Sequence, residues 1–240
     1  MITFSKEIFD LGLSKMSYCT DIHFLVSGGV DSVAASNFFF NKFCNLHKFK
    51  IYSYSSKIHP FLHPVSILHF NHGLRTQNEE MHHAVTLMHE DCCSISLEVK
   101  GKTENDFREA RIKWIEDNLT NTLCITAHHL DDATESYMLN ILRGKEGFVP
   151  IPFFTQVGDG NVIVHPFLFT KKKDFIDFAK RKNLKKYIVE DETNSITKGS
   201  RRNFLRHEIL PLLEKEQVGL DTIVKKKIKE RLIWEMLQNS

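Results

Sequence analysis

The sequence contains no stretch of about 18 consecutive apolar residues, the length that a membrane-spanning helix needs. We therefore expect no transmembrane segment and no membrane partner. Its first stretch, Met1–Lys15, carries charges and has no apolar centre of the kind found in secretory signals. We expect a protein of the cytoplasm or, as the alternative, of an organelle matrix or stroma.

Cysteines are few and are not arranged in pairs. The five of them are an odd number and form no C-x-x-C motif, so neither a disulfide framework nor a zinc or iron–sulfur site is predicted. We expect each thiol to be a small buried apolar group, with Cys92 and Cys93 at the end of a helix. The others are Cys19, Cys44 and Cys124.

Net charge is low, but it is unevenly distributed. The chain has 240 residues and a formal charge of +2, whereas residues 165–240 hold 18 Lys and Arg against 11 Asp and Glu. A basic C-terminal third can attract a polyanion; a solvated, lysine-rich helical surface is the alternative explanation. The length and the 42% hydrophobic content predict one large domain or one domain with a small appendage.

A glycine turn stands between a predicted strand and a predicted helix near the start of the chain. The apolar run Ile22–Val26 predicts a buried strand, and Val33–Phe43 is long enough for a helix. Gly28 and Gly29 between them have no Cβ, so the backbone can approach a ligand closely. Free N–H groups in the first helical turn add partial positive charge. This arrangement predicts an anion-binding turn.

The side chains of this turn indicate which anion it binds. Ser27 and Ser32 offer hydroxyl donors, whereas the Asp31 carboxylate is compatible with phosphate only if a divalent cation lies between them. The turn lacks the Lys-Ser/Thr ending of a Walker A loop and the third glycine of a dinucleotide fingerprint. It predicts a nucleotide with Mg²⁺, and a connection without a ligand is the alternative.

Strand and helix patterns then alternate along the chain, which predicts an α/β fold with a parallel sheet and helices on both faces. An ordered loop or lid is expected over Lys145–Asp159, before a last strand at Val162–His165. The other predicted elements are Ser5–Met16, Val65–Phe70, Asn78–Asp91, Ile95–Val99, Glu104–Asn118, a strand followed by a helix start within Leu123–Glu135, Lys171–Lys182 and a helix that opens at Arg201–Leu213.

Two strand ends carry polar groups, and the carboxyl ends of strands are where sites collect in open α/β sheets. His128 precedes a helix on which Asp132 and Glu135, three residues apart, share one face. These two carboxylates can hold Mg²⁺ or orient a nucleophile, whereas Asp131 is expected to cap the helix. After the second strand come His72 and Arg75, for which an ordinary surface position is the alternative.

Several motifs in this order resemble the PP-loop ATP pyrophosphatases and, among them, the tRNA(Ile)-lysidine synthase family. The motifs are Ser27–Ser32, His69–Arg75, Ala127–Glu135, Leu142–Gly144, Glu190–Asn194 and Arg202–Arg206. The resemblance implies a doubly wound parallel sheet of the PP-loop (adenine nucleotide alpha hydrolase-like) type with a small C-terminal helical appendage. Residues 1–185 would be the ATP-binding catalytic domain, and residues 186–240 a basic helical appendage that contacts tRNA.

The resemblance also implies a reaction: ATP-dependent ligation of free L-lysine to the wobble cytidine of an isoleucine tRNA, through an adenylated cytidine, with release of pyrophosphate and AMP. The implied ATP-binding residues are Ser27, Gly28, Gly29, Val30, Asp31 and Ser32. Asp31 and Asp132 would hold Mg²⁺, and the implied catalytic residues are Asp31, Asp132, His128 and Glu135. The implied contacts to tRNA or its cytosine are His72, Arg75, Arg143, Arg202 and Arg206.

The chain departs from the family in two places. The loop after Gly144 has fewer glycines, and the larger C-terminal tRNA-binding domains are absent, as in short forms that act with a small appendage or as a homodimer. Thiolating relatives are disfavoured because the paired cysteines they need are missing. Two rival functions stay open: another PP-loop ligase acting on a small acid, and a non-catalytic tRNA-binding module.

Overall fold

The computed structural model describes residues 1–44, 65–71, 78–88, 92–97, 103–145, 151–189, 201–216 and 218–238. His72, Arg75 and the motif at residues 190–194 lie outside the described residues, as does the region 46–64 for which the sequence shows no clear period.

The described strands form one six-stranded sheet in the order β3-β2-β1-β4-β6-β5. The first five in this order run parallel to their neighbours, and β5 pairs antiparallel with β6 at the edge. This arrangement confirms the α/β fold with a largely parallel sheet. The strands are β1 Asp21–Leu25, β2 Ser66–Asn71, β3 Cys92–Ser96, β4 Thr122–Ile125, β5 Phe154–Val157 and β6 Asn161–Val164.

Helices follow most of the strands. Three shorter helical turns come after α2, after α6 and between α7 and α8. The α-helices are α1 Lys6–Ser14, α2 Val30–Phe39, α3 Asn78–Met88, α4 Glu104–Asn118, α5 Leu130–Ile141, α6 Lys172–Arg181, α7 Arg201–Phe204, α8 Leu210–Lys215 and α9 Leu220–Gln238. The shorter turns are η1 Phe40–Cys44, η2 Lys185–Tyr187 and η4 Leu205–Ile209.

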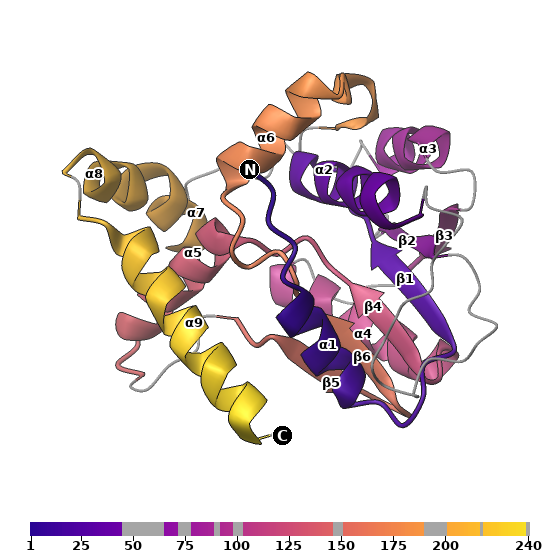
Figure 1. Cartoon of the computed structure of the whole chain (residues 1–240). Coiled ribbons are helices and arrows are strands. Elements are labelled where there is room, and N and C mark those ends of the chain that lie inside the picture. The colour runs from indigo at the N-terminus through magenta and orange to yellow at the C-terminus, as the bar shows by residue number, and fades with distance from the viewer. Residues whose placement is uncertain are drawn as a thin grey trace.

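Successive strand residues point to opposite faces of the sheet and so build two apolar cores. Phe24 and its neighbours on one face pack in the larger core with side chains of α1, α2, α6 and α9. On the other face, Cys124 and Ile163 pack against Ile115 of α4. The layers are visible in Figure 1, where α4 lies behind the sheet and α2 and α6 run side by side.

Two sequence-based expectations are wrong in detail. The region expected to be an ordered loop, Lys145–Asp159, contains β5, which forms a hairpin with β6 through Gly158 and Gly160, both at positive φ. The strand is only four residues long and is flanked by glycines and prolines, which indicate a loop, so its alternation of apolar and polar residues was not recognised. Strand β3 begins at Cys92 rather than Ile95, so Cys92 and Cys93 belong to a strand and not to a helix end.

The C-terminal helix α9 is part of the main core. Val224, Ile228 and Leu232, spaced four residues apart on one helical face, are buried in the same cluster as α1 and the sheet. Figure 1 shows α9 lying across α5 and beside α1. The division at residue 185 into two domains stays a prediction. Among the described helices, none combines the length and the apolar character that crossing a membrane requires.

Candidate active site

The site lies where the strand order reverses. From β1 the chain builds the sheet outward through β2 and β3, whereas β4 and β6 lie on the other side of β1. The loops leaving the carboxyl ends of β1 and β4 therefore diverge and leave a crevice between them, the usual ligand position in open α/β sheets. The glycine turn follows β1, and the segment that starts α5 follows β4.

The turn after β1 has the backbone shape that the two glycines allow. Gly28 has a φ of +89°, and a Cβ there would lie 3.1 Å from the Met81 side chain. Gly29 is the N-cap of α2, and no side chain of the described residues caps this helix. The first N–H groups of α2 thus stay available to an anion, as the sequence predicts.

The serine hydroxyls of the turn are partly used within it. Buried Ser32 Oγ donates to the Gly29 carbonyl at 3.0 Å and accepts from the Ser27 N–H at 3.1 Å. The two hydroxyl oxygens lie 3.1 Å apart, and Ser27 is exposed. Ser32 therefore holds the turn together, while Ser27 is the hydroxyl that faces solvent.

The start of α5 is fixed by a reciprocal cap. The His129 ring accepts from the Asp132 N–H at 3.4 Å, and the Asp132 carboxylate accepts from the His129 N–H at 3.1 Å. The expectation that Asp131 caps this helix is wrong: Asp131 instead accepts the backbone N–H of Lys172 at 2.7 Å, which joins α5 to α6.

Three carboxylates lie around the His129 ring. Its Nε2 lies 3.5 Å from Asp31 Oδ2 and 3.4 Å from Asp132 Oδ2, and its Nδ1 lies 3.5 Å from Asp131 Oδ2. Burial alone would lower the pKa of His129, but the three carboxylates outweigh it and raise the pKa to about 10. The ring half of the cap described above therefore forms only in the neutral state of His129; in the cationic state Nδ1–H donates toward Asp131, and the Asp132 carboxylate still caps the helix by accepting the His129 N–H.

The same contacts bring the two predicted metal ligands together. Asp31 comes from α2 and Asp132 from α5, and both face one imidazole nitrogen. Asp31 Oδ1 is buried and has no hydrogen-bond partner among the described residues. A bare buried carboxylate oxygen is costly unless a cation or donor reaches it. Beside them, Lys172 Nζ lies 4.0 Å from Asp31 Oδ2, a cation that the sequence patterns did not single out.

This donor set fits Mg²⁺, which prefers carboxylates supplemented by phosphate oxygens and water. No cluster of three or more His, Cys, Asp or Glu side chains suited to a metal occurs within the described parts of the chain, so a closed protein cage for a metal is not formed there. Asp31 and Asp132 would hold the ion, which when bound would neutralise phosphate charge in the crevice.

Glu135 is buried, and two arginines of the C-terminal segment bind it. It accepts from Arg202 Nε at 2.8 Å, from Arg206 Nε at 2.5 Å and from Arg206 Nη2 at 2.8 Å. Both guanidinium groups also reach Asp132 Oδ1, at 3.5 and 3.6 Å. The segment at residues 201–206 is thereby anchored on the acidic face of α5. That these arginines contact tRNA stays a prediction.

A second group of side chains borders the carboxyl ends of β4 and β6. Thr126 Oγ1 lies 2.8 Å from His128 Nδ1 and 2.6 Å from His165 Nδ1, and the two ring nitrogens are 3.2 Å apart. Desolvation by the surrounding protein, with repulsion from Arg111 and Arg202, lowers the pKa of His128 below its ordinary value, although the side chain is exposed on one side. His128 is therefore neutral at physiological pH. His165 is a site neighbour that sequence patterns did not single out.

Arg143 is separate from this cluster. It follows α5 at the opposite end from Asp132 and is exposed, next to Gly144, whose φ of +68° ends the helix as predicted. The structure thus brings together Asp31, Asp132, Glu135 and both arginines of the C-terminal segment, and it leaves Arg143 about two helical turns away.

Comparison with curated proteins finds relatives named tRNA(Ile)-lysidine synthase. Proteins named tRNA(Ile)-lysidine synthase from Coxiella burnetii and Histophilus somni are 31% and 30% identical over 159 and 186 residues. These matches cover 62% and 72% of this chain, but only 34% and 43% of those proteins. The relative from Buchnera aphidicola subsp. Acyrthosiphon pisum is 30% identical over 63% of this chain and 36% of its own. The chain spans less than half the length of these relatives.

Among solved structures, the U34-tRNA thiolase NcsA from Methanococcus maripaludis with its [4Fe-4S] cluster has a similar fold. The TM-score is 0.61 at 12% identity, over 95% of this chain and 78% of that one. At this identity the likeness shows the fold alone. The PP-loop domain family matches residues 12–213, most of the chain and the whole of the site described above, and the chain belongs to that family.

Proposed function

We propose that this chain ligates free L-lysine to the wobble cytidine of an isoleucine tRNA at the expense of ATP. The observation that carries the proposal is that Asp31, beside the glycine turn, and Asp132, from α5, lie next to each other at the same nitrogen of His129. Membership of the PP-loop domain family supports the use of ATP, and the curated relatives support lysidine synthesis as the reaction.

In the first step, ATP would lie with its pyrophosphate on the N–H groups of residues 28–32, with Mg²⁺ between it and the carboxylates of Asp31 and Asp132. The cytosine O2 would attack the α-phosphorus, forming the O2–P bond as the bond to pyrophosphate breaks. Fixed N–H donors and Lys172, 4.0 Å from Asp31, would stabilise the negative charge of the departing pyrophosphate.

In the second step, the lysine amine would form a bond to C2 of the adenylated cytosine while AMP leaves with O2. The amine must lose a proton, and His128, neutral at physiological pH, would accept it. Glu135 stays a candidate to bind the lysine ammonium. Since Arg202 and Arg206 already bind its carboxylate, that role requires at least one guanidinium to move.

The tRNA would approach over the C-terminal helices, where the excess of Lys and Arg is concentrated. We propose that the site works in the cytoplasm or an organelle matrix, where tRNA and ATP are present.

A homodimer would add a second basic surface for the tRNA. The exposed Ile233, Trp234 and Leu237 on α9 are apolar groups that a second copy could cover, and light scattering would detect the pair.

The proposal is tested by incubating the protein with ATP, Mg²⁺, lysine and an isoleucine tRNA transcript, followed by mass spectrometry of the anticodon fragment. The expected product is a cytidine heavier by one lysine less one water. Asp31→Asn should abolish pyrophosphate release while the protein stays folded by circular dichroism, because this side chain contributes a ligand and not core packing.

Omission of tRNA is the matched control. Pyrophosphate release that continues without tRNA, with a small acid as the acceptor, would identify another PP-loop ligase. Tight tRNA binding without any ATP turnover would identify a non-catalytic module. A fully active Asp31→Asn protein would refute the assignment of the metal site.

A further inference from the structure

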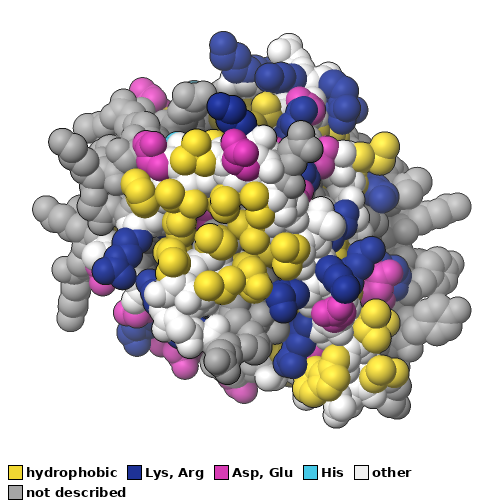
Figure 2. Space-filling view, turned by 90° about the vertical axis from the view of Figure 1, so that its left-hand side faces the viewer, with side chains coloured by type: hydrophobic (Ala, Val, Ile, Leu, Met, Phe, Trp, Pro, Cys, Tyr) yellow, Lys and Arg dark blue, Asp and Glu magenta, His cyan; other side chains and the backbone are white. Residues whose placement is uncertain are grey.

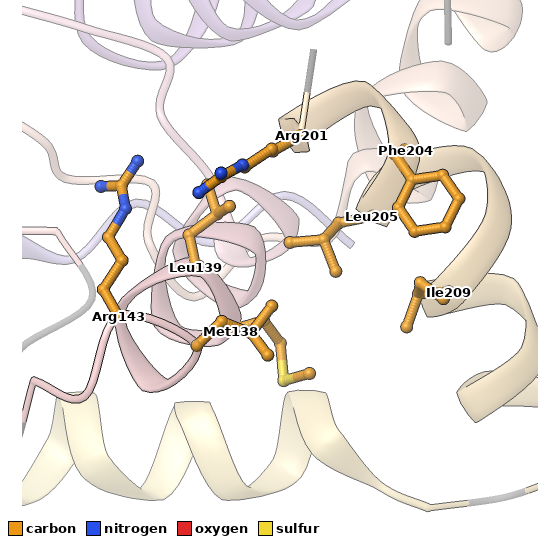
Figure 3. A pocket seen from close by; sticks show the side chains of 8 residues that line it. Met138, Leu139, Arg143, Arg201, Phe204, Leu205 and Ile209 are labelled. Carbon is orange, nitrogen blue, oxygen red and sulfur yellow. The ribbon is translucent and has the colours of Figure 1, made fainter. Parts of the chain in front are cut away.

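An apolar pocket of about 450 Å³ lies between α5 and the C-terminal segment, beyond the acids. Its volume falls within the range of about 300–1,000 Å³ typical of small-molecule sites. Figure 3 shows the aliphatic side chains of α5 facing Leu205 and Ile209 of η4 across it, with Phe204 of α7 beside them and two arginine side chains on one side. The lining residues are Met138, Leu139, Leu142, Arg143, Arg201, Phe204, Leu205 and Ile209.

The pocket opens on an apolar surface with a basic border. Leu142 is 69% exposed and Phe204 50%, unusually high fractions for large apolar side chains that lie together. Figure 2 looks at the side of the molecule that carries α5, α7 and α8, and it shows apolar side chains gathered in a broad patch with Lys and Arg, and also Asp and Glu, around it. This surface suits a ligand that has one flat or apolar part and one negatively charged part.

The two arginines of the pocket differ from their neighbours in their contacts. Arg202 and Arg206 bind Glu135, whereas among the residues that the structure describes no carboxylate forms an ion pair with Arg143 or Arg201. Both side chains are exposed. An exposed guanidinium at the mouth of an apolar pocket is suited to phosphate, through paired N–H donors.

The pocket continues directly from the proposed active site along the same two helical segments. Met138 and Leu139 follow Glu135 by three and four residues on α5, so they lie on the same face one turn later. On the facing segment, Leu205 directly precedes Arg206, which binds Glu135. One turn of about 5.4 Å therefore separates the acids from the apolar walls, and a ligand extending from the active site enters this pocket next.

We propose that this pocket binds a nucleotide adjacent to the cytidine that is modified. The base would stack on the Phe204 ring against the aliphatic wall, and its phosphate would bind Arg143 and Arg201. This inference rests on the proposed function, since it takes the substrate to be a single-stranded loop of tRNA. Stacking of splayed bases on aromatic rings, with arginines on the phosphates, is how proteins commonly hold such loops.

The test uses a synthetic anticodon stem-loop of isoleucine tRNA and measures its affinity for the full chain by fluorescence anisotropy at fixed salt. Phe204→Ala and Phe204→Leu should each weaken binding about tenfold, the loss expected for one base stack, whereas Phe204→Trp should retain it. Arg201→Glu and Arg143→Glu should weaken it further. The matched control is Lys113→Glu, a charge reversal on the exposed face of α4, which should leave the affinity within twofold.

Photo-crosslinking locates the nucleotide. Stem-loops carrying 4-thiouridine at single positions beside the wobble cytidine should crosslink to peptides from residues 138–143 or 201–209. Crosslinks confined to other peptides, or equal affinity of Phe204→Leu and wild type, would overturn the proposal. A dimer that Phe204→Ala converts to monomer at unchanged RNA affinity would show that a second copy occupies the pocket, which also overturns it.

Lysine incorporation by the wild-type protein is measured alongside and separates the two proposals. Loss of stem-loop affinity in the pocket variants, with no lysine incorporated by wild type, supports the pocket and refutes the reaction. Incorporation with the same KM for tRNA in wild type and Phe204→Leu supports the reaction and refutes the pocket.

Discussion

Removing the Glu135 carboxylate should detach the C-terminal segment from α5. Glu135 is only 2% exposed and binds two guanidinium groups that are themselves about a quarter exposed. Taking away one partner of a buried ion pair costs about 3–5 kcal/mol. Because both arginines keep a longer contact to Asp132, we expect Glu135→Ala to lie at the lower end, about 3 kcal/mol. For a chain of this size, that lowers the melting temperature by about 6–12 °C.

The assay is thermal unfolding followed by circular dichroism, together with a double-mutant cycle. Glu135→Ala and Arg206→Ala, alone and combined, should give a coupling free energy of at least about 1 kcal/mol, because the two side chains share two hydrogen bonds. Glu135→Gln should lie between wild type and Glu135→Ala. Glu208→Ala, which removes an exposed acid from the same segment, is the control and should change stability by less than about 0.5 kcal/mol.

Limited proteolysis adds a local measurement. If the ion pairs hold the segment in place, Glu135→Ala should be cut near residues 201–216 at protease concentrations that leave wild type intact. Additive single-mutant effects, or a Glu135→Ala protein that melts within about 2 °C of wild type, would contradict the anchoring role.

Three further predictions test the packing and the glycine turn. Burial raises the pKa of the Cys19 and Cys124 thiols to about 11 and about 12, so iodoacetamide at pH 8 should label both only after unfolding; labelling of the native protein would contradict their burial. The ion pair of Lys171 with Asp221 lowers the Asp221 pKa, so its stabilisation should be present at neutral pH and lost as the pH falls below about 4. Since both side chains are at least one-third exposed, Asp221→Asn should cost no more than about 1 kcal/mol at pH 7 in urea unfolding, and a loss unchanged at pH 3 would refute this. Gly28→Ala, at a φ of +89°, should cost about 1–2 kcal/mol and weaken ATP binding by calorimetry, whereas unchanged ATP affinity would refute the role of the turn.

The sequence predicted the fold, and the glycine turn at the end of β1, because both rest on local patterns. The backbone shape of a glycine turn between a strand and a helix depends on the turn residues themselves. Asp132 and Glu135 share a helical face because residues three apart in a helix do so. What the sequence did not predict depends on contacts between distant segments. The pairing of Glu135 with Arg202 joins residues 67 positions apart, and no spacing rule reports such a contact.

His129 illustrates the same limit. In the sequence it is one of two adjacent histidines, and only the folded chain shows that its ring, rather than that of His128, meets the carboxylates of two helices. Strand β5 was missed for a different reason. Its four residues form an edge hairpin among glycines and prolines, where a short alternating pattern is too weak to detect.

The position of α9 has a consequence for synthesis of the protein on the ribosome. Ile228 and its neighbours complete a core to which α1, α2, α6 and the sheet also contribute, so those surfaces are made long before the helix that covers them. Until α9 emerges, the nascent chain exposes apolar surface that chaperones recognise. A stalled or slowed ribosome near residue 220 would therefore leave this protein especially prone to aggregation.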